Sequence, residues 1–411
     1  MKYGLIGEKL GHSFSKEIHS RLAGYEYELK EIPKENLGGF FAEKKFSGIN
    51  VTIPYKESVM KYLDFISDEA KSIGAVNTVV NSGGKLYGYN TDFFGLKSLI
   101  KRAEIEVCGK NVFILGFGGT SRTAKAVCES LGAKSIVKVA RTARYGAITY
   151  AEFYEMANDV NIIINTTPVG TFPNIFDIAA DLTNFSKLSG VIDVVYNPLR
   201  TKLVQTAKDL SVKADGGLYM LVSQAVKASE IFTGVEYSKD TSDRVFEEIK
   251  TAKENIVLTG MPSSGKSTVG KILAEKLGRD FIDTDDIVVK RTGKKISDLI
   301  VEKGEIAFRK IETECVKEIS VFSGKVIATG GGVILDSENV SALKQNGKIF
   351  FIDRPLDKLI PTYDRPLSST LEDIKRLYVA RRATYISTAD ERIAADCDAF
   401  TVADKILRSI G

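Results

Sequence analysis

At 411 residues the chain is longer than one hydrophobic core usually supports, so two or three domains of ordinary size are expected. Hydrophobic residues make up 44% and charged residues 27% of the sequence, values that exclude a disordered or fibrous protein. The formal charge of +4 is small, and Lys and Arg are interspersed with Asp and Glu, which argues against a nucleic-acid-binding protein.

The cysteines and the apolar runs indicate the cellular setting. The four cysteines show no C-x-x-C spacing, so neither a disulfide framework nor a zinc site is expected. No stretch reaches the roughly 20 apolar residues that span a membrane. We therefore expect a cytoplasmic protein whose partners are small molecules, with neither a nucleic acid nor a membrane among them.

Residues 1–101 alternate short apolar segments with helical patterns. The segments YGLIG, GINVTIP and AVNTVV predict strands, and residues 56–64 and 92–101 predict helices. The pattern restarts at 111–115 (NVFIL) and continues through predicted strands at 135–140, 161–165 and 190–195 to a helix near 220–232. Near-continuous apolar strands are typical of a parallel sheet covered on both faces.

A charged stretch at 235–254 separates two parts of the chain. It contains neither Pro nor Gly and predicts a helix that leads into a short linker, with a domain boundary near Ile249. Beyond it, strands are predicted at 256–259, 281–283, 325–329 and 348–353, and a helix at 266–277. The sequence thus predicts a second, doubly wound α/β unit over residues 250–411.

The motif G-x-x-x-x-G-K-[ST] occurs as GMPSSGKS over 260–267, between a predicted strand and a predicted helix. In such a P-loop, glycines let backbone N–H groups surround phosphates, and the helix N-terminus favours negative charge. Lys266 would reach the terminal phosphates and the Ser267 hydroxyl would bind Mg²⁺. The predicted phosphate-binding residues are Gly260, Ser263, Ser264, Gly265, Lys266, Ser267 and Thr268.

Polar residues follow the later strands of the second unit. Asp283 and Asp285 follow one strand, three glycines at 330–332 follow another, and arginines recur downstream. Carboxylates at a strand end can hold a metal or a polyol, and glycines permit close approach of backbone to substrate. Separated arginines suit a carboxylate and a transferring phosphoryl group.

The ordered set GMPSSGKST, FIDTDD, AFRKIE, ATGGG, TYDRPL and RRATY resembles shikimate kinase over residues 255–411. The resemblance implies ATP and Mg²⁺ as cofactors, with Asp283 between the substrate hydroxyl and the metal. Lys266 and Arg365 would stabilise the transferring phosphoryl group, and Lys358 stands where the family often has an adenine-stacking Arg. The residues implied to hold shikimate are Asp285, Arg309, Gly330, Gly331, Gly332 and Arg382.

Two candidate catalytic groups stand out in the N-terminal half. Both histidines, His12 and His19, fall in GHSFSKEIHS; a catalytic pair is one hypothesis, and hydrogen-bonded structural histidines are the preferred one. Lys56 ends NVTIPYK and Asp92 ends GYNTD. A Lys and an Asp held together in a cleft can move a proton, although the sequence does not show that these two meet.

A dinucleotide signal follows the strand NVFIL. Gly116, Gly118 and Gly119 in LGFGGTSR depart from G-x-G-x-x-G because Ser121 takes the third position. Arginines at 141 and 144 stand where NAD enzymes place a ribose-binding carboxylate. They favour the 2′-phosphate of NADP.

The segments GHSFS, NVTIPYK, GAVNTV, GYNTD, GFGGTSR, NTTPVG, DVVYNP and GLYMLVSQA resemble shikimate dehydrogenase over residues 1 to about 245. The resemblance implies a substrate-binding domain over 1–101, to which a helix near 218–245 returns, and a Rossmann-type NADP domain over 102–249. It makes Lys56 the principal acid/base group and Asp92 its partner. The implied substrate-binding residues are Ser13, Ser15, Thr52, Asn77, Asn90, Tyr196 and Gln224. The implied cofactor-binding residues are Gly116, Gly118, Gly119, Thr120, Arg141, Thr142, Arg144, Thr166 and Met220.

The sequence departs from this family at Lys16, Ser20 and Ala140; the last replaces an Asn that often precedes the cofactor arginine. Together, the resemblances imply a bifunctional enzyme of aromatic amino-acid biosynthesis that uses NADPH to reduce 3-dehydroshikimate and ATP to phosphorylate shikimate. The alternatives are a quinate or mixed quinate/shikimate dehydrogenase that uses NAD in the first unit, and a regulatory protein built on inactive enzyme domains. Oligomeric state and transfer of shikimate between sites stay open.

Overall fold

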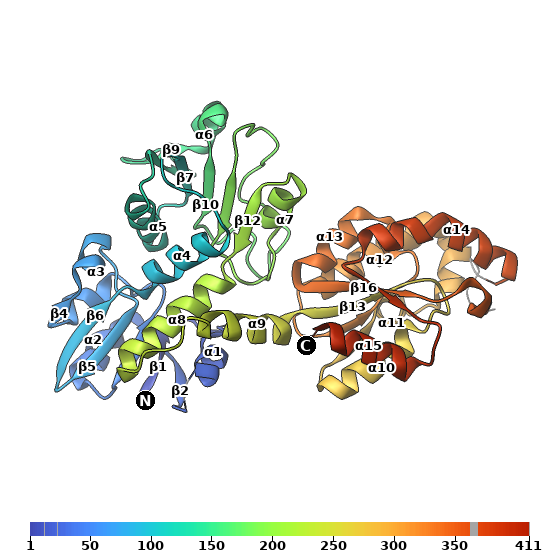
Figure 1. The fold of residues 1–411 in the computed structure, drawn as a ribbon, viewed down its shortest axis with the longest axis horizontal. Coiled ribbons are helices and arrows are strands. Elements are labelled where there is room, and N and C mark those ends of the chain that lie inside the picture. The colour runs from blue at the N-terminus through green and yellow to red at the C-terminus, as the bar shows by residue number, and fades with distance from the viewer. Residues whose placement is uncertain (12, 23, 362–368, 411) are drawn as a thin grey trace. The chain divides into compact units, whose positions relative to one another are not determined.

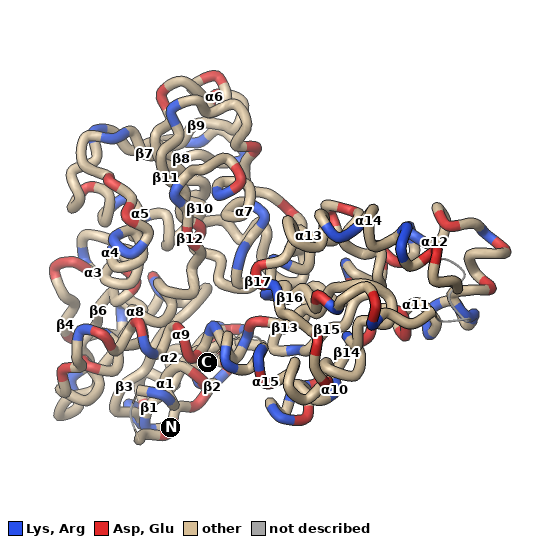
Figure 2. The backbone as a smooth tube through the Cα atoms, turned by 45° about the vertical axis from the view of Figure 1, so that its right-hand side comes forward, with Lys and Arg blue, Asp and Glu red and all other residues tan. Residues whose placement is uncertain are grey.

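The structure, a computed structural model, describes residues 1–11, 13–22, 24–361 and 369–410. Internal contacts divide it into two compact units, one of residues 1–197 and 201–249 and the other of residues 198–200 and 250–411. Both are α/β, as the sequence predicts, whereas a further boundary near residue 101 stays a prediction. Lys and Arg are interspersed with Asp and Glu along the backbone of each unit (Figure 2).

The first unit contains two six-stranded sheets (Figure 1). The first has the order β2-β1-β3-β5-β6-β4 and is mixed, because β5 runs antiparallel to β3 and β6. The second has the order β12-β11-β10-β7-β8-β9 and is parallel throughout. The strands are β1 (Tyr3–Gly7), β2 (Tyr27–Glu31), β3 (Gly48–Val51), β4 (Phe65–Ile66), β5 (Thr78–Ser82), β6 (Lys85–Tyr89), β7 (Asn111–Leu115), β8 (Ser135–Ala140), β9 (Ile148–Thr149), β10 (Ile162–Asn165), β11 (Gly190–Asp193) and β12 (Lys213–Gly216).

Helices α4 and α8 pack against each other between the two sheets (Figure 1). Helix α4 begins where the Asn90 side chain accepts a hydrogen bond from the Phe93 N–H, and α8 ends at Gly234, which has a φ of 70°. The α-helices of this part are α1 (Ser15–Leu22), α2 (Leu37–Glu43), α3 (Asp68–Ile73), α4 (Thr91–Arg102), α5 (Gly119–Ser130), α6 (Tyr150–Glu155), α7 (Lys202–Asp209) and α8 (Leu218–Thr233). Helix α9 (Thr241–Lys253) carries the chain into the second unit.

Burial explains the strand pattern. Four of the five residues of β7 are buried, as expected for a strand covered on both faces.

The predicted helix at 56–64 is reduced to a short 3₁₀ turn, Ser58–Tyr62, in which Val59 is the buried residue. One buried apolar side chain in that stretch is too few to anchor a longer amphipathic helix.

The second unit is built on one parallel sheet with the order β14-β15-β13-β16-β17. Its strands are β13 (Asn255–Thr259), β14 (Phe281–Asp283), β15 (Val326–Ala328), β16 (Gly347–Asp353) and β17 (Glu391–Ala394). Its α-helices are α10 (Lys266–Leu277), α11 (Thr284–Thr292), α12 (Ile296–Ser320), α13 (Ser337–Asn346), α14 (Leu371–Thr388) and α15 (Ala399–Ile410). Strands β14, β15 and β13 are neighbours, so the segments that follow them meet at one edge of the sheet, where ligands bind in doubly wound folds.

Candidate active sites

Lys56 and Asp92 meet in the first unit. The Lys56 Nζ lies 2.6 Å from the Asp92 Oδ2, and the two side chains are 19% and 11% exposed. Lys56 lies in the turn after β3, and Asp92 in the first turn of α4, where the Asn90 cap fixes the helix start. The carboxylate holds the ammonium group in place, so the pair can donate and recover a proton.

A cavity of 490 Å³ opens beside this pair. Its lining includes most of the predicted substrate-binding set, and Met220, which the resemblance assigns to the cofactor, lies here too. Asn90 does not line it, because its amide is used to cap α4 and to donate to the Ala75 carbonyl. The predicted residues that line the cavity are Ser13, Ser15, Thr52, Lys56, Asn77, Asp92, Thr120, Thr166, Tyr196, Met220 and Gln224.

Asn50 also lines this cavity, although it was not identified as a site residue from the sequence. It precedes Thr52 by two residues along an extended segment, and side chains two apart in a strand share a face, so the NVT pattern could have indicated it. The Tyr27 hydroxyl donates to its Oδ1 at 2.7 Å, and its Nδ2 donates to the Thr78 Oγ1 at 3.0 Å. These bonds fix the orientation of the buried amide.

His19 lines neither the 490 Å³ cavity nor the neighbouring 760 Å³ cavity, and its contacts are those of a residue that supports the fold. Its ring stacks on Tyr27 with centroids 3.9 Å apart, and its Nδ1 lies 2.6 Å from the Tyr25 hydroxyl. Complete burial lowers the pKa of His19 to about 3, so the ring is neutral at ordinary pH. This supports the preferred hypothesis for His19, whereas His12 lies outside the described residues.

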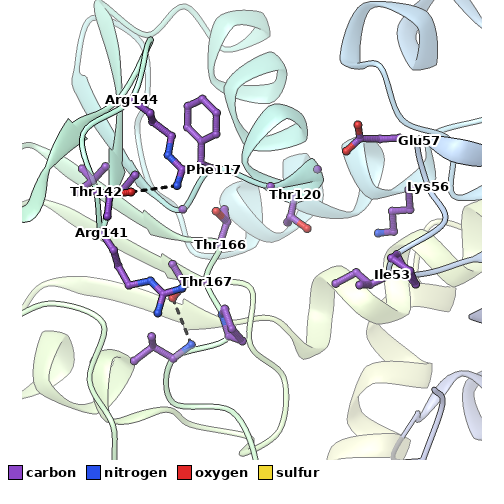
Figure 3. Close-up of a pocket in the computed structure, with 18 of the residues that line it drawn as sticks. Ile53, Lys56, Glu57, Phe117, Thr120, Arg141, Thr142, Arg144, Thr166 and Thr167 are labelled. Atoms are coloured by element: carbon purple, nitrogen blue, oxygen red, sulfur yellow. Dashed lines mark hydrogen bonds between the residues drawn. The ribbon is translucent and has the colours of Figure 1, made fainter. Parts of the chain in front are cut away.

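A second cavity, of 760 Å³, shares Lys56, Thr120 and Thr166 with the first, so the two meet at the Lys56 side chain. Figure 3 shows Arg141, Thr142 and Arg144 on one side of it and Lys56 on the other. Gly116 has a φ of 118°, and a Cβ at this position would lie 2.5 Å from the Thr166 Oγ1, so only glycine fits. The predicted cofactor residues that line this cavity are Gly116, Gly118, Gly119, Thr120, Arg141, Thr142, Arg144 and Thr166.

A buried carboxylate, that of Asp193, joins the loops that border both cavities. It accepts from the Asn165 Nδ2 at 2.9 Å, from the Val195 N–H at 3.0 Å and from the Thr201 Oγ1 at 2.7 Å. Asn165 in turn accepts from the N–H and the hydroxyl of Thr167, which lines both cavities. Burial raises the pKa of Asp193 to about 6 despite these three donors.

In the second unit, the P-loop lies between β13 and α10. Gly260 and Gly265 have φ values of 147° and 92°, which explains why the motif needs glycine at both places. The Lys266 Nζ donates to the carbonyls of Gly260 and Met261, each at 2.9 Å. These contacts fold the lysine back over the loop, where it can meet phosphate oxygens.

The Ser267 hydroxyl donates to the Asp283 Oδ2 at 2.6 Å, and the Asp285 N–H donates to the Asp283 Oδ1 at 3.0 Å. Hydroxyl and carboxylate oxygens are the ligands that Mg²⁺ prefers, so this pair fits the metal that the P-loop implies. Ser263 donates to the Ile360 carbonyl, and Ser264 is buried without a hydrogen-bond partner for its Oγ among the described residues. Thr268 follows in the first turn of α10.

The predicted shikimate-binding residues other than Arg382 lie at or around the glycines after β15. A Cβ at Gly330 would lie 2.7 Å from the Asp285 Oδ1, and one at Gly332 would lie 2.2 Å from the Arg309 Nη1. Arg309 is held by the buried Glu312 at 2.7 Å. Asp285, Arg309 and the glycines 330–332 are therefore brought together, and Glu312 is a buried supporting group that the sequence did not indicate.

The two adjacent arginines of α14, Arg381 and Arg382, contact different residues. Arg381 is buried and its Nη1 donates to the Gly331 carbonyl at 3.1 Å, so it joins the Arg309 side of the site. Arg382, the predicted ligand, instead contacts the buried Asp353 at 2.8 Å. The spacing of Arg381 and Tyr385, four residues apart, places both on one helix face, and the Tyr385 hydroxyl also donates to the Gly331 carbonyl.

Two predicted kinase residues remain. Lys358 lies in the 3₁₀ turn Leu356–Lys358 and its Nζ donates to the Asp396 carbonyl at 2.5 Å. Arg365 lies outside the described residues.

None of the described helices combines the length and the apolar composition that a membrane span requires.

Comparisons with known proteins agree with this division. The family model described as shikimate dehydrogenase substrate binding domain matches residues 5–79, and the one described as shikimate kinase matches residues 262–411. A shikimate dehydrogenase (NADP(+)) of Clostridium perfringens is 42% identical over 265 residues, covering 60% of this chain and 98% of the relative.

Solved structures give the same result. A chorismate mutase/shikimate 5-dehydrogenase fusion protein from Clostridium acetobutylicum is 38% identical with a TM-score of 0.57, covering 60% of this chain and 96% of the other. A shikimate 5-dehydrogenase from Thermus thermophilus, in complex with NADP(H) and shikimate, is 28% identical with a TM-score of 0.55 and covers 60% and 99%.

Proposed function

Because the chain belongs to the shikimate dehydrogenase family and also carries a shikimate kinase domain, we propose that it catalyses two consecutive reactions. The first unit reduces 3-dehydroshikimate to shikimate with NADPH. The second transfers the terminal phosphoryl group of ATP to the 3-hydroxyl of that shikimate. The observation that carries the first assignment is that the cofactor and substrate cavities meet at Lys56, which is paired with Asp92.

In the reduction, NADPH when bound supplies the hydride. The Lys56 ammonium group donates a proton to the carbonyl oxygen of the substrate as the alcohol forms. Asp92 accepts a hydrogen bond from that ammonium group and keeps it in place. Ser13, Ser15, Asn77 and the other polar lining residues orient the substrate hydroxyls and carboxylate.

For the cofactor, two features of the cavity support NADP rather than NAD. Arg141 and Arg144 both line it, at the end of β8 where an NAD enzyme would carry a carboxylate. Guanidinium groups bind phosphate through charge-assisted hydrogen bonds.

The four cysteines are free thiols, which supports a reducing compartment such as the cytoplasm.

In the phosphorylation, ATP supplies the phosphoryl group and Mg²⁺ would be held by Ser267 and Asp283. Lys266 neutralises charge on the terminal phosphates, and Arg365 is proposed to share that role. Asp285 and the glycines 330–332 hold the shikimate hydroxyls, and Arg309 holds the carboxylate. We assign Arg381 as the second carboxylate ligand in place of Arg382, because only Arg381 contacts Gly331.

Separate assays of the two units test this proposal. The purified chain should reduce 3-dehydroshikimate with NADPH at a higher kcat/KM than with NADH, and at a higher kcat/KM than it reduces 3-dehydroquinate. It should also consume ATP in a shikimate-dependent way. Preference for NADH or for 3-dehydroquinate would replace the first assignment, and ATP turnover that is indifferent to shikimate would remove the second.

A further inference from the structure

The adenosine end of the 760 Å³ cavity contains an aromatic residue that neither sequence pattern accounts for. Phe117 lies between Gly116 and Gly118 in the turn from β7 to α5, and it is 37% exposed. The neighbouring glycines provide the backbone geometry of this turn, so the side chain at 117 is free to serve another purpose. Figure 3 shows its ring beside Arg144 and Thr142.

Two cations lie against this ring. The guanidinium carbon of Arg144 lies 5.1 Å from the ring centroid, and the Lys138 Nζ lies 5.2 Å from it. Both distances fall within the range of cation–π attraction. The Arg144 Nη2 also donates to the Thr142 Oγ1 at 3.2 Å, so the guanidinium group is held from two sides.

Carboxylates pair with some of the cations in this region but not with others. Among the described residues, Lys138, Arg141 and Arg144 form no ion pair with Asp or Glu. Burial lowers the pKa of Lys138, and the nearby Lys125 and Arg122 lower it further although they are paired with Glu129 and Glu57, whereas Glu129 opposes the shift. Such a cluster favours a ligand with two negative charges.

An aromatic ring at position 117 affects the charge and the N–H donors of Arg144 differently from an acidic side chain. A Glu at position 117 would also hold Arg144, but it would cancel the positive charge and occupy the N–H donors. A ring attracts the guanidinium group without cancelling its charge, and it leaves the N–H groups at the edge free to bind phosphate oxygens.

We infer that Phe117 is a specificity-determining residue, which positions the Arg144 guanidinium group to bind the 2′-phosphate of the cofactor. This inference rests on the proposed use of NADP. Phe117 acts through Arg144 rather than through contact with the adenosine. Lys138 adds positive charge at the same place.

Direct binding measurements test this without relying on turnover. Isothermal titration calorimetry of the full chain would use two probes, adenosine 2′,5′-bisphosphate and adenosine 5′-monophosphate. Phe117→Leu should weaken binding of the bisphosphate by about 2- to 5-fold, the fold-change that corresponds to one cation–π contact, and leave the monophosphate unchanged. Phe117→Tyr, which keeps the ring, should bind both probes as the wild type does.

The same substitution in a chain that lacks Arg144 distinguishes positioning of Arg144 by Phe117 from direct contact of Phe117 with the ligand. In an Arg144→Gln chain, adding Phe117→Leu should cause no further loss of bisphosphate affinity, because the group that the ring holds is already gone. Equal weakening of both probes, or no weakening of either, would overturn the inference in a chain whose circular dichroism is unchanged. If the wild type itself does not prefer the bisphosphate, the NADP assignment fails, which is a distinguishable result.

Discussion

Replacing Lys56 with Gln removes the ammonium group at the junction of the two cavities and keeps a side chain of similar length. Among the residues that the structure describes, this group has one ionic partner, Asp92, at 2.6 Å. General acid catalysis by a positioned group contributes about 100- to 10,000-fold to a rate. We therefore expect kcat for NADPH-dependent reduction to fall by at least about 100-fold.

The same substitution should destabilise the unit without unfolding it. Asp92 loses its cation but still faces the cavity, so the penalty is that of one poorly paired polar group, about 1–3 kcal/mol. In a unit of this size such a change lowers the unfolding temperature by about 2–12 °C, at roughly 2–4 °C per kcal/mol. The variant should thus be folded at assay temperature, and the activity loss reports on chemistry.

The assay follows NADPH absorbance with saturating 3-dehydroshikimate, and the ATP-dependent reaction is measured on the same preparation. Lys187→Gln is the matched control, because that lysine is exposed and lines neither cavity. The control should reduce substrate like the wild type, and both variants should keep full kinase activity. Retention of more than a tenth of kcat in Lys56→Gln would refute its role as the acid, and loss of both activities in a folded chain would refute independent sites.

Three further outcomes are expected. Lys266→Ala should lower shikimate phosphorylation by at least about 100-fold and leave NADPH-dependent reduction unchanged, because the charge over the P-loop is lost. Arg381→Gln should raise KM for shikimate by about 10-fold or more. Arg382→Gln, which removes contacts to Asp353 and Tyr378, should change KM less than about 2-fold, and the reverse order would restore Arg382 as the ligand. His19, whose folded-state pKa of about 3 lies below the ordinary value, stabilises the fold fully above about pH 6.5 and loses that contribution as the pH falls towards 3. Between pH 7 and 5 the wild type should therefore lose about 2 kcal/mol more unfolding free energy than His19→Phe in urea titrations, and identical losses would contradict the buried neutral ring.

The fold class and the two families were predictable because their signals are local. A P-loop needs its glycines directly between a strand and a helix, and GMPSSGKS has both neighbours in the sequence. The turn LGFGGTSR works in the same way for the second sheet of the first unit. In both places, backbone geometry within a few residues decides the function of the segment.

The positions of Arg382 and Asn90, and the residues that the sequence did not indicate, depend on information that is not local. Choosing between Arg381 and Arg382 requires the phase of α14, since adjacent residues on a helix point about 100° apart. Asn90 is polar and lies in a motif, but the first turn of α4 uses its side chain as a cap. Glu312 supports Arg309 from a buried position that only tertiary packing reveals.

The meeting of Lys56 with Asp92 likewise depends on the packing of the β3 turn against α4. The sequence offered both residues as candidates, and only the structure places them 2.6 Å apart. The roles of the individual site residues stay predictions until the variants are measured.

The most direct measurement is a coupled assay with one purified chain. 3-Dehydroshikimate, NADPH, ATP and Mg²⁺ are supplied together, and the products are separated and identified by mass spectrometry. We expect shikimate 3-phosphate to accumulate, with one NADPH consumed for each molecule formed. Absence of that product with every pairing of NADPH or NADH with ATP would contradict the assignment of two consecutive activities to this chain.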